Sequence, residues 1–334
     1  MTPRPRDRQL RLFEVAPQAP RGPRPAPFDA ALGPLAAALP PLVRLGTSSW
    51  SFPGWQGLVY DGPVSAASLA RCGLTAYARH PLLGCVGLDR TYYGPVEAQY
   101  FHALAAQVPD AFRFVVKADE RCTRYRFGAH PRYGDARGKM NPLFLDSAYA
   151  AERVVAPMIE GLGPKSGVLV FQFPPQDLRP LGGPARFVAR LGAFLEALPR
   201  GPRYAVEIRN AEVLGGDYLD MLAAAEASHC VAVHPSMPEP AVQAAFLADR
   251  PQPAFVCRWM LRRDLGYEDA KARFAPFDRL AAEDPVTRTT IADLAAAAAR
   301  AGRECFVTVN NKAEGSAPLS IARLAAAIAA HASA

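Results

Sequence analysis

The sequence predicts a TIM (β/α)8 barrel preceded by a disordered N-terminal tail. Three observations favour this fold class: the chain has 334 residues, eight short β-rich apolar runs follow one another, and an Ala/Leu-rich segment with helical periodicity follows each run. A composition of 50% apolar and 21% charged residues excludes a disordered or fibrous protein. A doubly wound open sheet stays the second possibility, because periodicity does not show that a sheet closes.

The tail is expected to cover residues 1–40 and the barrel domain residues 41–334. The first 27 residues contain seven prolines and many charges, a composition that buries too little apolar surface to fold. Residues 1–24 carry a net charge of +4 out of the total of +7, so the barrel itself is nearly neutral. Charge alone therefore indicates little about a partner.

The predicted strands and helices alternate along the chain. The strands are expected in the runs 43–50, 82–92, 112–119, 167–175, 204–210, 230–235, 254–260 and 305–311. The helices are expected near 64–80, 95–107, 146–162, 185–198, 217–229, 240–250, 279–301 and 317–332.

Alternation within the runs predicts which side chains fill the barrel. In the third run, Phe112, Phe114 and Val116 share one face, and Arg113 and Lys117 lie on the other. The apolar face is expected against the helices, and the last polar residue of the inner face at the C-terminal mouth, where barrel enzymes carry out their chemistry. The residues collected in this way are Thr47, Ser49, Asp89, Lys117, Gln172, Glu207, Arg209, His234, Arg258, Asn310 and Asn311.

Five segments together resemble domain of unknown function family 72, the YecE-like proteins. They are GTSSWSFPGWQG from Gly46, FRFVVKA from Phe112, VLVFQFPP from Val168, YAVEIR from Tyr204 and VNNKAEGSAP from Val309. The resemblance runs from about residue 43 to the C-terminus. It implies a TIM barrel and no established activity.

The sequence departs from the pattern of that family at several polar positions. The family's usual Glu-Ile-Asn reads Gly87-Leu88-Asp89, so one carboxylate is missing and another stands two residues later. Arg124 and Lys312 stand where histidines are usual, and the His-Gly after the seventh strand is replaced near Trp259. These departures indicate a divergent subfamily and weigh against a mechanism that needs those side chains.

Lys117 and Glu207 are the candidate acid/base pair. Both are expected on inner faces at the mouth, where burial and an opposite charge tune protonation. The structural alternative is a buried ion pair that stabilises the barrel. Arg209 and Arg258 are the candidate ligands of a carboxylate or phosphate, with pairing to Glu207 or Asp89 as the alternative.

Neutral and aromatic residues complete the candidate site. Asn310 and Asn311 are expected to orient a ligand, or to form a turn. Gln172 offers a neutral hydrogen bond beside two prolines that end the strand. Trp50, Trp55 and Tyr93 are candidates for the wall of a pocket for a ring or sugar, with plain packing as the alternative.

Cofactors are not predicted. The six histidines form no HxH or HxxxH pair, the six cysteines form no CxxC pair, and no Walker loop or GxSxG elbow is present. A divalent metal held by Asp89 or Glu207 together with a substrate phosphate stays open. Free cysteines, the lack of an apolar run of about 18 residues and the lack of a secretory signal predict a cytoplasmic protein without a membrane partner.

The long loop after the third predicted strand is basic and aromatic. Its cations suit a nucleic-acid backbone, or a lid over an anionic small molecule, and a solvated loop is the third reading. The candidate nucleic-acid or lid residues are Arg121, Arg124, Arg126 and Arg132.

The tail contains a short motif, Gln9-Leu10-Arg11-Leu12-Phe13. It resembles the pentapeptide by which bacterial replication and repair proteins bind the DNA polymerase sliding clamp. A disordered segment can present Gln9, Leu10, Leu12 and Phe13 to a groove. The alternative is a short amphipathic segment that docks on its own barrel.

Two functions are therefore predicted. The first is an enzyme, a hydrolase or another acid/base enzyme, that acts on an anionic, phosphate-bearing substrate at the barrel mouth. The second is a DNA-associated replication or repair accessory protein recruited to the sliding clamp through residues 9–13. The expected partners are accordingly an anionic small molecule or nucleic acid, and the clamp.

Overall fold

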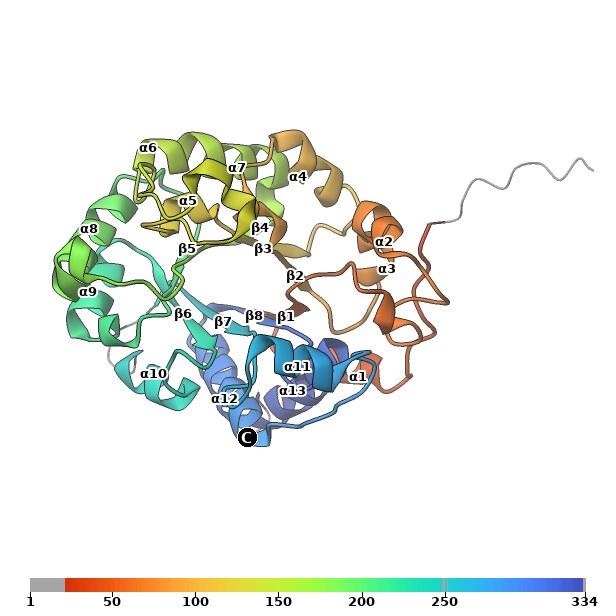
Figure 1. Ribbon diagram of the computed structural model, residues 1–334. Coiled ribbons are helices and arrows are strands. Elements are labelled where there is room, and N and C mark those ends of the chain that lie inside the picture. Colours follow the sequence, from red (N-terminus) through yellow and green to blue (C-terminus); the bar gives the residue numbers. More distant parts are fainter. Residues whose placement is uncertain (1–21, 248–249, 251, 333–334) are drawn as a thin grey trace, which may run out of the picture.

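The computed structural model describes residues 22–247, 250 and 252–332, and its strands form a closed parallel barrel (Figure 1). The order around the barrel is β1 to β8, so each strand pairs with its neighbours in sequence and β8 pairs with β1. The strands are β1 (Val43–Thr47), β2 (Cys85–Leu88), β3 (Arg113–Lys117), β4 (Ser166–Gln172), β5 (Tyr204–Glu207), β6 (Ser228–Val233), β7 (Ala254–Trp259) and β8 (Glu304–Val309). The predicted fold class and all eight strand positions are confirmed.

The helices surround the barrel (Figure 1). They are α1 (Leu32–Ala37), α2 (Ala66–Cys72), α3 (Leu74–Tyr77), α4 (Ala98–Ala105), α5 (Glu120–Thr123), α6 (Ser147–Ala150), α7 (Ala156–Leu162), α8 (Gly183–Glu196), α9 (Gly216–Ala224), α10 (Pro240–Leu247), α11 (Tyr267–Phe274), α12 (Pro285–Arg300) and α13 (Ala317–Ala332). Among the described residues, no helix is long and apolar enough to cross a membrane.

The helical predictions need correction at several places, of which two bear on the fold. The helix predicted at 217–229 ends at Ala224, because Glu226 has a φ of 53° and turns the chain into β6. Helix α11 was not predicted, since five of its eight residues are charged or Tyr and its apolar stripe is short.

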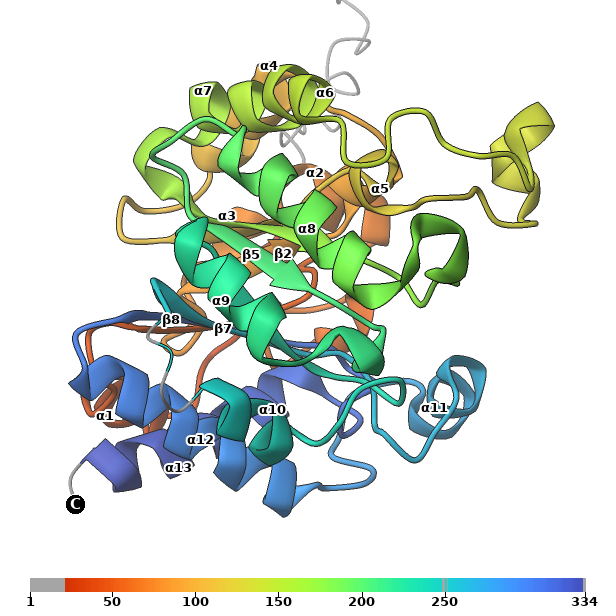
Figure 2. The same cartoon turned by 90° about the vertical axis from the view of Figure 1, so that its left-hand side faces the viewer.

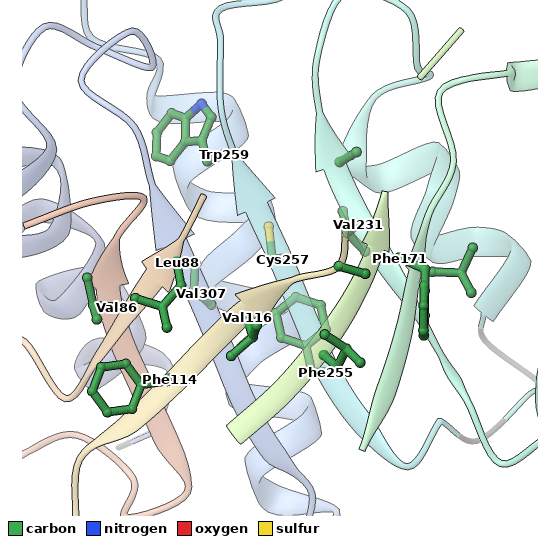
Figure 3. Packing of buried hydrophobic residues seen from close by; sticks show 14 of the residues in the cluster. Val86, Leu88, Phe114, Val116, Phe171, Val231, Phe255, Cys257, Trp259 and Val307 are labelled. Atoms are coloured by element: carbon green, nitrogen blue, oxygen red, sulfur yellow. The ribbon is translucent and has the colours of Figure 1, made fainter. Parts of the chain in front are cut away.

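The two faces of each strand separate the core into two parts. A small cluster fills the barrel and includes Val115, Val170 and Ala205. A larger cluster lies between strands and helices and includes Phe114 and Val116, as the alternation predicted. Figure 3 shows outward-facing residues of this larger cluster, such as Val86 of β2, which pairs with Phe114 of β3.

Helices α4 and α7 pack unusually closely on the outside of the barrel. Gly161 of α7 permits this, because a Cβ atom there would lie 2.4 Å from the Ala98 carbonyl oxygen and 2.4 Å from Phe101 Cβ. The segment Ala151–Val155, a π-helix, joins α6 to α7.

The N-terminal segment contacts the barrel earlier than the sequence predicted. Residues 22–40 were expected to belong to the tail, but Leu32 and Leu35 of α1 pack against the core, and Ala26 is buried. The Ala26 amide donates to the Val59 carbonyl at 3.0 Å, and Arg24 pairs with Asp61 at 2.8 Å. Apolar residues at helical spacing explain this attachment. The motif Gln9 to Phe13 lies outside the described residues.

Two segments project from the same side of the barrel, beyond the carboxyl ends of the strands (Figure 2). One is residues 124–141, between α5 and α6, here called the arm. The other is α11. The barrel mouth therefore lies between two projections.

Candidate active site

The carboxyl ends of β2, β3, β5 and β7 bring five charged residues together. Lys117, Glu207 and Arg258 lie on inner faces of their strands, and Asp89 and Arg209 follow two residues after inner positions. These five residues are called the central cluster. Gln172 lies beside it, because its Cα pairs with that of Glu207 and the side chain is buried.

Glu207 holds the central cluster together. Its Oε1 accepts hydrogen bonds from Arg209 Nε at 3.0 Å and Nη2 at 2.9 Å, and its Oε2 accepts one from Arg258 Nη1 at 2.5 Å. The Glu207 side chain has no exposed surface. Arg258 is also buried and donates through Nη2 to Asp89 Oδ1 at 2.8 Å. Both carboxylates are thus bound to arginine forks, whose geometry suits bidentate pairing.

The charges around Glu207 determine its protonation. Burial alone raises the pKa of Glu207, but Arg258, Arg209 and Lys117 lower it to about 2. The carboxylate is therefore ionised throughout the physiological range. A permanently ionised, fully paired carboxylate orients the two guanidinium groups and is poorly suited to release a proton near pH 7.

Lys117 differs from the other cations of the central cluster. Its Nζ lies 3.7 Å from the centroid of the Tyr92 ring, and no residue that the structure describes accepts a hydrogen bond from it. Burial lowers the pKa of Lys117 to about 8, with Asp89 and Arg258 acting in opposite directions. This amine therefore has free hydrogen-bonding capacity and exchanges a proton close to neutral pH.

A pocket of about 360 Å³ opens beside the central cluster. It is called the aromatic pocket, and its lining includes Trp50, Gly87, Asp89, Arg90, Tyr93 and Tyr100. Asp89 belongs to both the pocket and the central cluster. Tyr93 is 67% exposed, and Arg132 of the arm lies 4.8 Å from its ring centroid. The predicted wall residues Trp50 and Tyr93, and Ser49, meet here.

Thr47 does not face the mouth. The sequence placed it there, but it shares the outer face of β1 with Leu45, and its hydroxyl bonds to Tyr77 of α3 at 2.8 Å. The inner-face residue is Ser48, which accepts a hydrogen bond from Asn310 Nδ2 at 2.8 Å. The error arose because the run contains three consecutive small polar residues, which hide the alternation.

The asparagine pair has structural partners. Asn311 Oδ1 accepts from Trp55 Nε1 at 3.0 Å and from the Ala317 amide, the first residue of α13, at 2.9 Å. Asn310 Oδ1 accepts from the Lys312 amide at 3.0 Å. Trp55 is buried against Phe52 and does not line the aromatic pocket.

His234, at the end of β6, is half-buried and bonds through Nδ1 to Ser236 Oγ at 2.9 Å. Burial and the nearby Arg209 lower the pKa of His234 to about 4, so its imidazole is neutral at pH 7. Within residues 22–247, 250 and 252–332, no three His, Cys, Asp or Glu side chains are grouped so that they could hold a metal ion.

Arg124 and Arg132 of the arm, and Arg121 just before it, have acidic partners. Glu120 is buried, and its Oε2 accepts from Arg124 at 2.9 Å, Arg132 at 2.7 Å and the Tyr133 hydroxyl at 2.8 Å. Arg121 donates to both carboxylate oxygens of Asp119, through Nε to Oδ1 at 3.2 Å and through Nη2 to Oδ2 at 2.7 Å. Arg126 is more peripheral and donates to the Gly138 carbonyl at 3.1 Å. These ion pairs stabilise the fold of the arm. They leave the folded arm with less unpaired positive charge than its sequence suggests.

Several residues of the site were not predicted from the sequence. Tyr92, Tyr100, Gly87 and Arg90 were not selected, because none is the last polar residue of an inner strand face. The turn Arg90–Tyr93 positions two of them, and Thr91 fixes it by donating to the Lys117 carbonyl at 2.6 Å. The aromatic pair Tyr92-Tyr93, three residues after Asp89, is the signal that could have identified Tyr92.

The fold and site define a class: a TIM barrel with an ionised, arginine-rich C-terminal mouth. The chain belongs to the DUF72 family, described as proteins of unknown function, whose model matches residues 44–334. A DUF72 family protein from Thermotoga maritima MSB8 has a similar crystal structure, with a TM-score of 0.58 and 19% identity over 84% of this chain and 97% of that one. A crystal structure of a DUF72 family protein from Enterococcus faecalis V583 is also similar, with a TM-score of 0.54 and 20% identity over 87% of this chain and 96% of that one. No curated protein matches the chain.

Proposed function

We propose that the protein is an enzyme that binds a small anionic, phosphate-bearing substrate at the barrel mouth and moves a proton with Lys117. The observation that carries this proposal is the Lys117 amine, which lies among the charges of the central cluster without a hydrogen-bond acceptor from any described residue. Structural lysines in ion pairs have such acceptors. A free amine in a polar mouth is available to a ligand.

The charge balance of the central cluster supports an anion. Three cations face two carboxylates, and Glu207 is already paired on both oxygens. Arg209 uses Nε and Nη2 for Glu207, which leaves its Nη1 without a partner among the described residues. Lys117 and Arg209 can therefore both donate to a phosphate or carboxylate.

The roles of the carboxylates differ. Glu207 acts as a positioning residue, because both its oxygens orient arginines and its pKa of about 2 keeps it ionised. Lys117, with a pKa near 8, serves as general acid when protonated and as general base when neutral. Asp89 is half-exposed and can accept a hydrogen bond from substrate.

The test combines binding and turnover. Pyrophosphate binding is measured by calorimetry for the wild type, Lys117→Met, Lys117→Arg and Arg200→Met. Arg200 is exposed and pairs with Glu226, so it controls for the loss of one charge away from the mouth. Phosphate release from a panel of phosphate esters gives the turnover.

We expect Lys117→Met to lose binding, and Lys117→Arg to keep binding and lose turnover, since a guanidinium does not exchange its proton near neutral pH. Equal binding by Lys117→Met and wild type would show that Lys117 contacts no anion and would remove the proposal.

Association with DNA is the second candidate. Two exposed tyrosines on the mouth side each have a cation over the ring: Arg132 lies 4.8 Å from Tyr93, and Lys312 lies 4.1 Å from Tyr267. Such pairs suit the stacking of bases in a single strand. Gel mobility shifts measured against salt test this function, because phosphate contacts give a steep salt dependence. No shift at low salt would remove it.

A further inference from the structure

The aromatic pocket has walls that suit a flat ring. Trp50 is held in place by its Nε1, which donates to the Leu69 carbonyl at 2.8 Å, and by the Tyr60 hydroxyl, which donates to the Trp50 carbonyl. Tyr100 has the Arg90 guanidinium 5.7 Å from its centroid. Tyr93 exposes 67% of its surface at the rim. A volume of about 360 Å³ falls in the range of small-molecule sites.

Gly87 helps to keep this pocket open. It lines the pocket from β2, and even a Cβ atom at this position would lie 3.1 Å from the Ser48 backbone. Because β2 has no side chain here, the next inner residue, Asp89, is the first carboxylate that a ligand in the pocket meets.

Asp89 stands between the pocket and the cations. Its Oδ1 accepts from Arg258, whereas no described residue donates to its Oδ2, and 37% of the side chain is exposed. An ionised carboxylate with a free oxygen accepts hydrogen bonds from hydroxyl groups. A neighbouring pair of sugar hydroxyls fits this position, and a phosphate does not, because the charges repel.

The cations of the central cluster lie beyond Asp89. Arg258 links Asp89 to Glu207, and Tyr92 links the pocket to Lys117, because its ring is 5.5 Å from that of Tyr93 and 3.7 Å from Lys117 Nζ. The order across the mouth is therefore aromatic walls, a free carboxylate oxygen, and unpaired cationic donors. Base, ribose and phosphate follow one another in the same order in a nucleotide.

We infer that the site binds a nucleotide, with the base in the aromatic pocket, the ribose hydroxyls at Asp89 and the phosphate at Lys117 and Arg209. The inference rests on the proposed function and names its substrate class. A free nucleotide and the 3′-terminal nucleotide of an RNA strand share this chemistry, and the experiment distinguishes them.

The experiment measures, by calorimetry, the affinity of the full chain for AMP and for its two fragments, adenosine and ribose 5-phosphate. The variants are Tyr93→Ala, Lys117→Met and, as matched control, Phe246→Ala, which removes an exposed aromatic side chain of α10 that lies outside the aromatic pocket and the central cluster. Urea unfolding checks that each variant is folded. A hexaribonucleotide of A residues with a free 3′ end, whose last nucleotide keeps both ribose hydroxyls, provides the nucleic-acid arm.

We expect AMP to bind at least tenfold more tightly than either fragment. Tyr93→Ala should weaken AMP and adenosine by about tenfold and leave ribose 5-phosphate unchanged, in line with the magnitude of ring stacking. Lys117→Met should weaken AMP and ribose 5-phosphate and leave adenosine unchanged. Phe246→Ala should bind like the wild type. Tighter binding of the hexanucleotide than of AMP would identify a strand terminus as the source of the nucleotide. Tighter binding of AMP than of the hexanucleotide would identify a free nucleotide as the source.

Three results would overturn the inference in different ways. Equal affinities for AMP and ribose 5-phosphate, insensitive to Tyr93→Ala, would reject the base pocket and leave the proposed function in place. Binding of adenosine and AMP with equal affinity, insensitive to Lys117→Met, would reject the anion site and with it the proposed function. Absence of binding by folded wild type to all three compounds would reject both.

Discussion

Arg258 Nη1 lies 2.5 Å from Glu207 Oε2 at the centre of the barrel mouth, and neither side chain has more than 4% of its surface exposed. The pair joins β5 to β7, which are not neighbours in the barrel. Arg258 reaches past β6 to make this contact, and it also binds Asp89 after β2. One buried guanidinium thus connects three strand ends, and its charge is balanced inside the fold.

Glu207→Met should destabilise the protein by about 3–5 kcal/mol, because it leaves Arg258 buried without its main counter-charge. Urea unfolding gives the free energy. Glu226→Gln is the matched control, since Glu226 forms an exposed pair with Arg200 and surface pairs contribute about 0–1 kcal/mol. Equal decreases in the free energy of unfolding in the two variants would contradict a stabilising role of the buried Glu207.

Lys117 should make stability rise with pH in the alkaline range. Burial lowers the pKa of Lys117 from 10.5 to about 8, so between these values the unfolded chain binds more protons than the folded one. The free energy of unfolding therefore increases from about pH 8 to about pH 10.5 through this group, and its unfavourable contribution is fully present below pH 8.

Lys117→Met removes this contribution, so the unfolding free energy of the wild type minus that of the variant should increase from about pH 8 to about pH 10.5. Unfolding at pH 7, 9 and 10.5 measures it, and Lys271→Met, on the exposed face of α11, is the control. A pH-independent difference would show that Lys117 has its ordinary pKa.

Glu120→Gln should loosen the arm. Three donors converge on Glu120 Oε2, and the neutral amide weakens the two charge-assisted hydrogen bonds from Arg124 and Arg132. Trypsin, which cleaves after arginine, should cut the arm several-fold faster, while the rest of the chain stays protected. Glu97→Gln, in an exposed pair with Arg153, should not change the rate. An unchanged rate of cleavage in Glu120→Gln would mean that the two ends of the arm, and not the contacts of Glu120, keep it folded.

Changing both Leu12 and Phe13 to Ala should abolish micromolar binding to a bacterial sliding clamp, because these two side chains are the apolar anchors of the tail motif. Val15→Ala serves as control outside the motif. Surface-immobilised clamp and full-length protein measure the affinity. No binding by the unchanged protein would make the five-residue match a coincidence.

The sequence predicted the barrel well because alternation and helical periodicity are local properties. It also placed Lys117, Glu207 and Arg258 correctly, since each is the last polar residue of an inner strand face. The pairing within this group was not predictable, because Arg258 and Glu207 are 51 residues apart and two strands apart in the barrel. Whether a cation is paired or free is decided by such distant contacts.

The predictions for the arm and for Thr47 went wrong for other reasons. A basic, aromatic composition suggested a charged surface, but Glu120 and Asp119 neutralise Arg132 and Arg121 once the arm folds. Thr47 was misplaced because three small polar residues in succession give no alternation from which to choose a face. The partner of Thr47, Tyr77, lies in a helix 30 residues away.

The close packing at Gly161 has a consequence for the mouth. Gly161 lets α7 press against α4, and α4 carries Tyr100, a wall of the aromatic pocket. A methyl group at position 161 would have to push α4 outward, since the atoms it meets belong to the α4 backbone and to Phe101 Cβ. Pocket dimensions are therefore set from the outer surface of the barrel, and a residue with no access to ligand can govern how large a ring the protein admits.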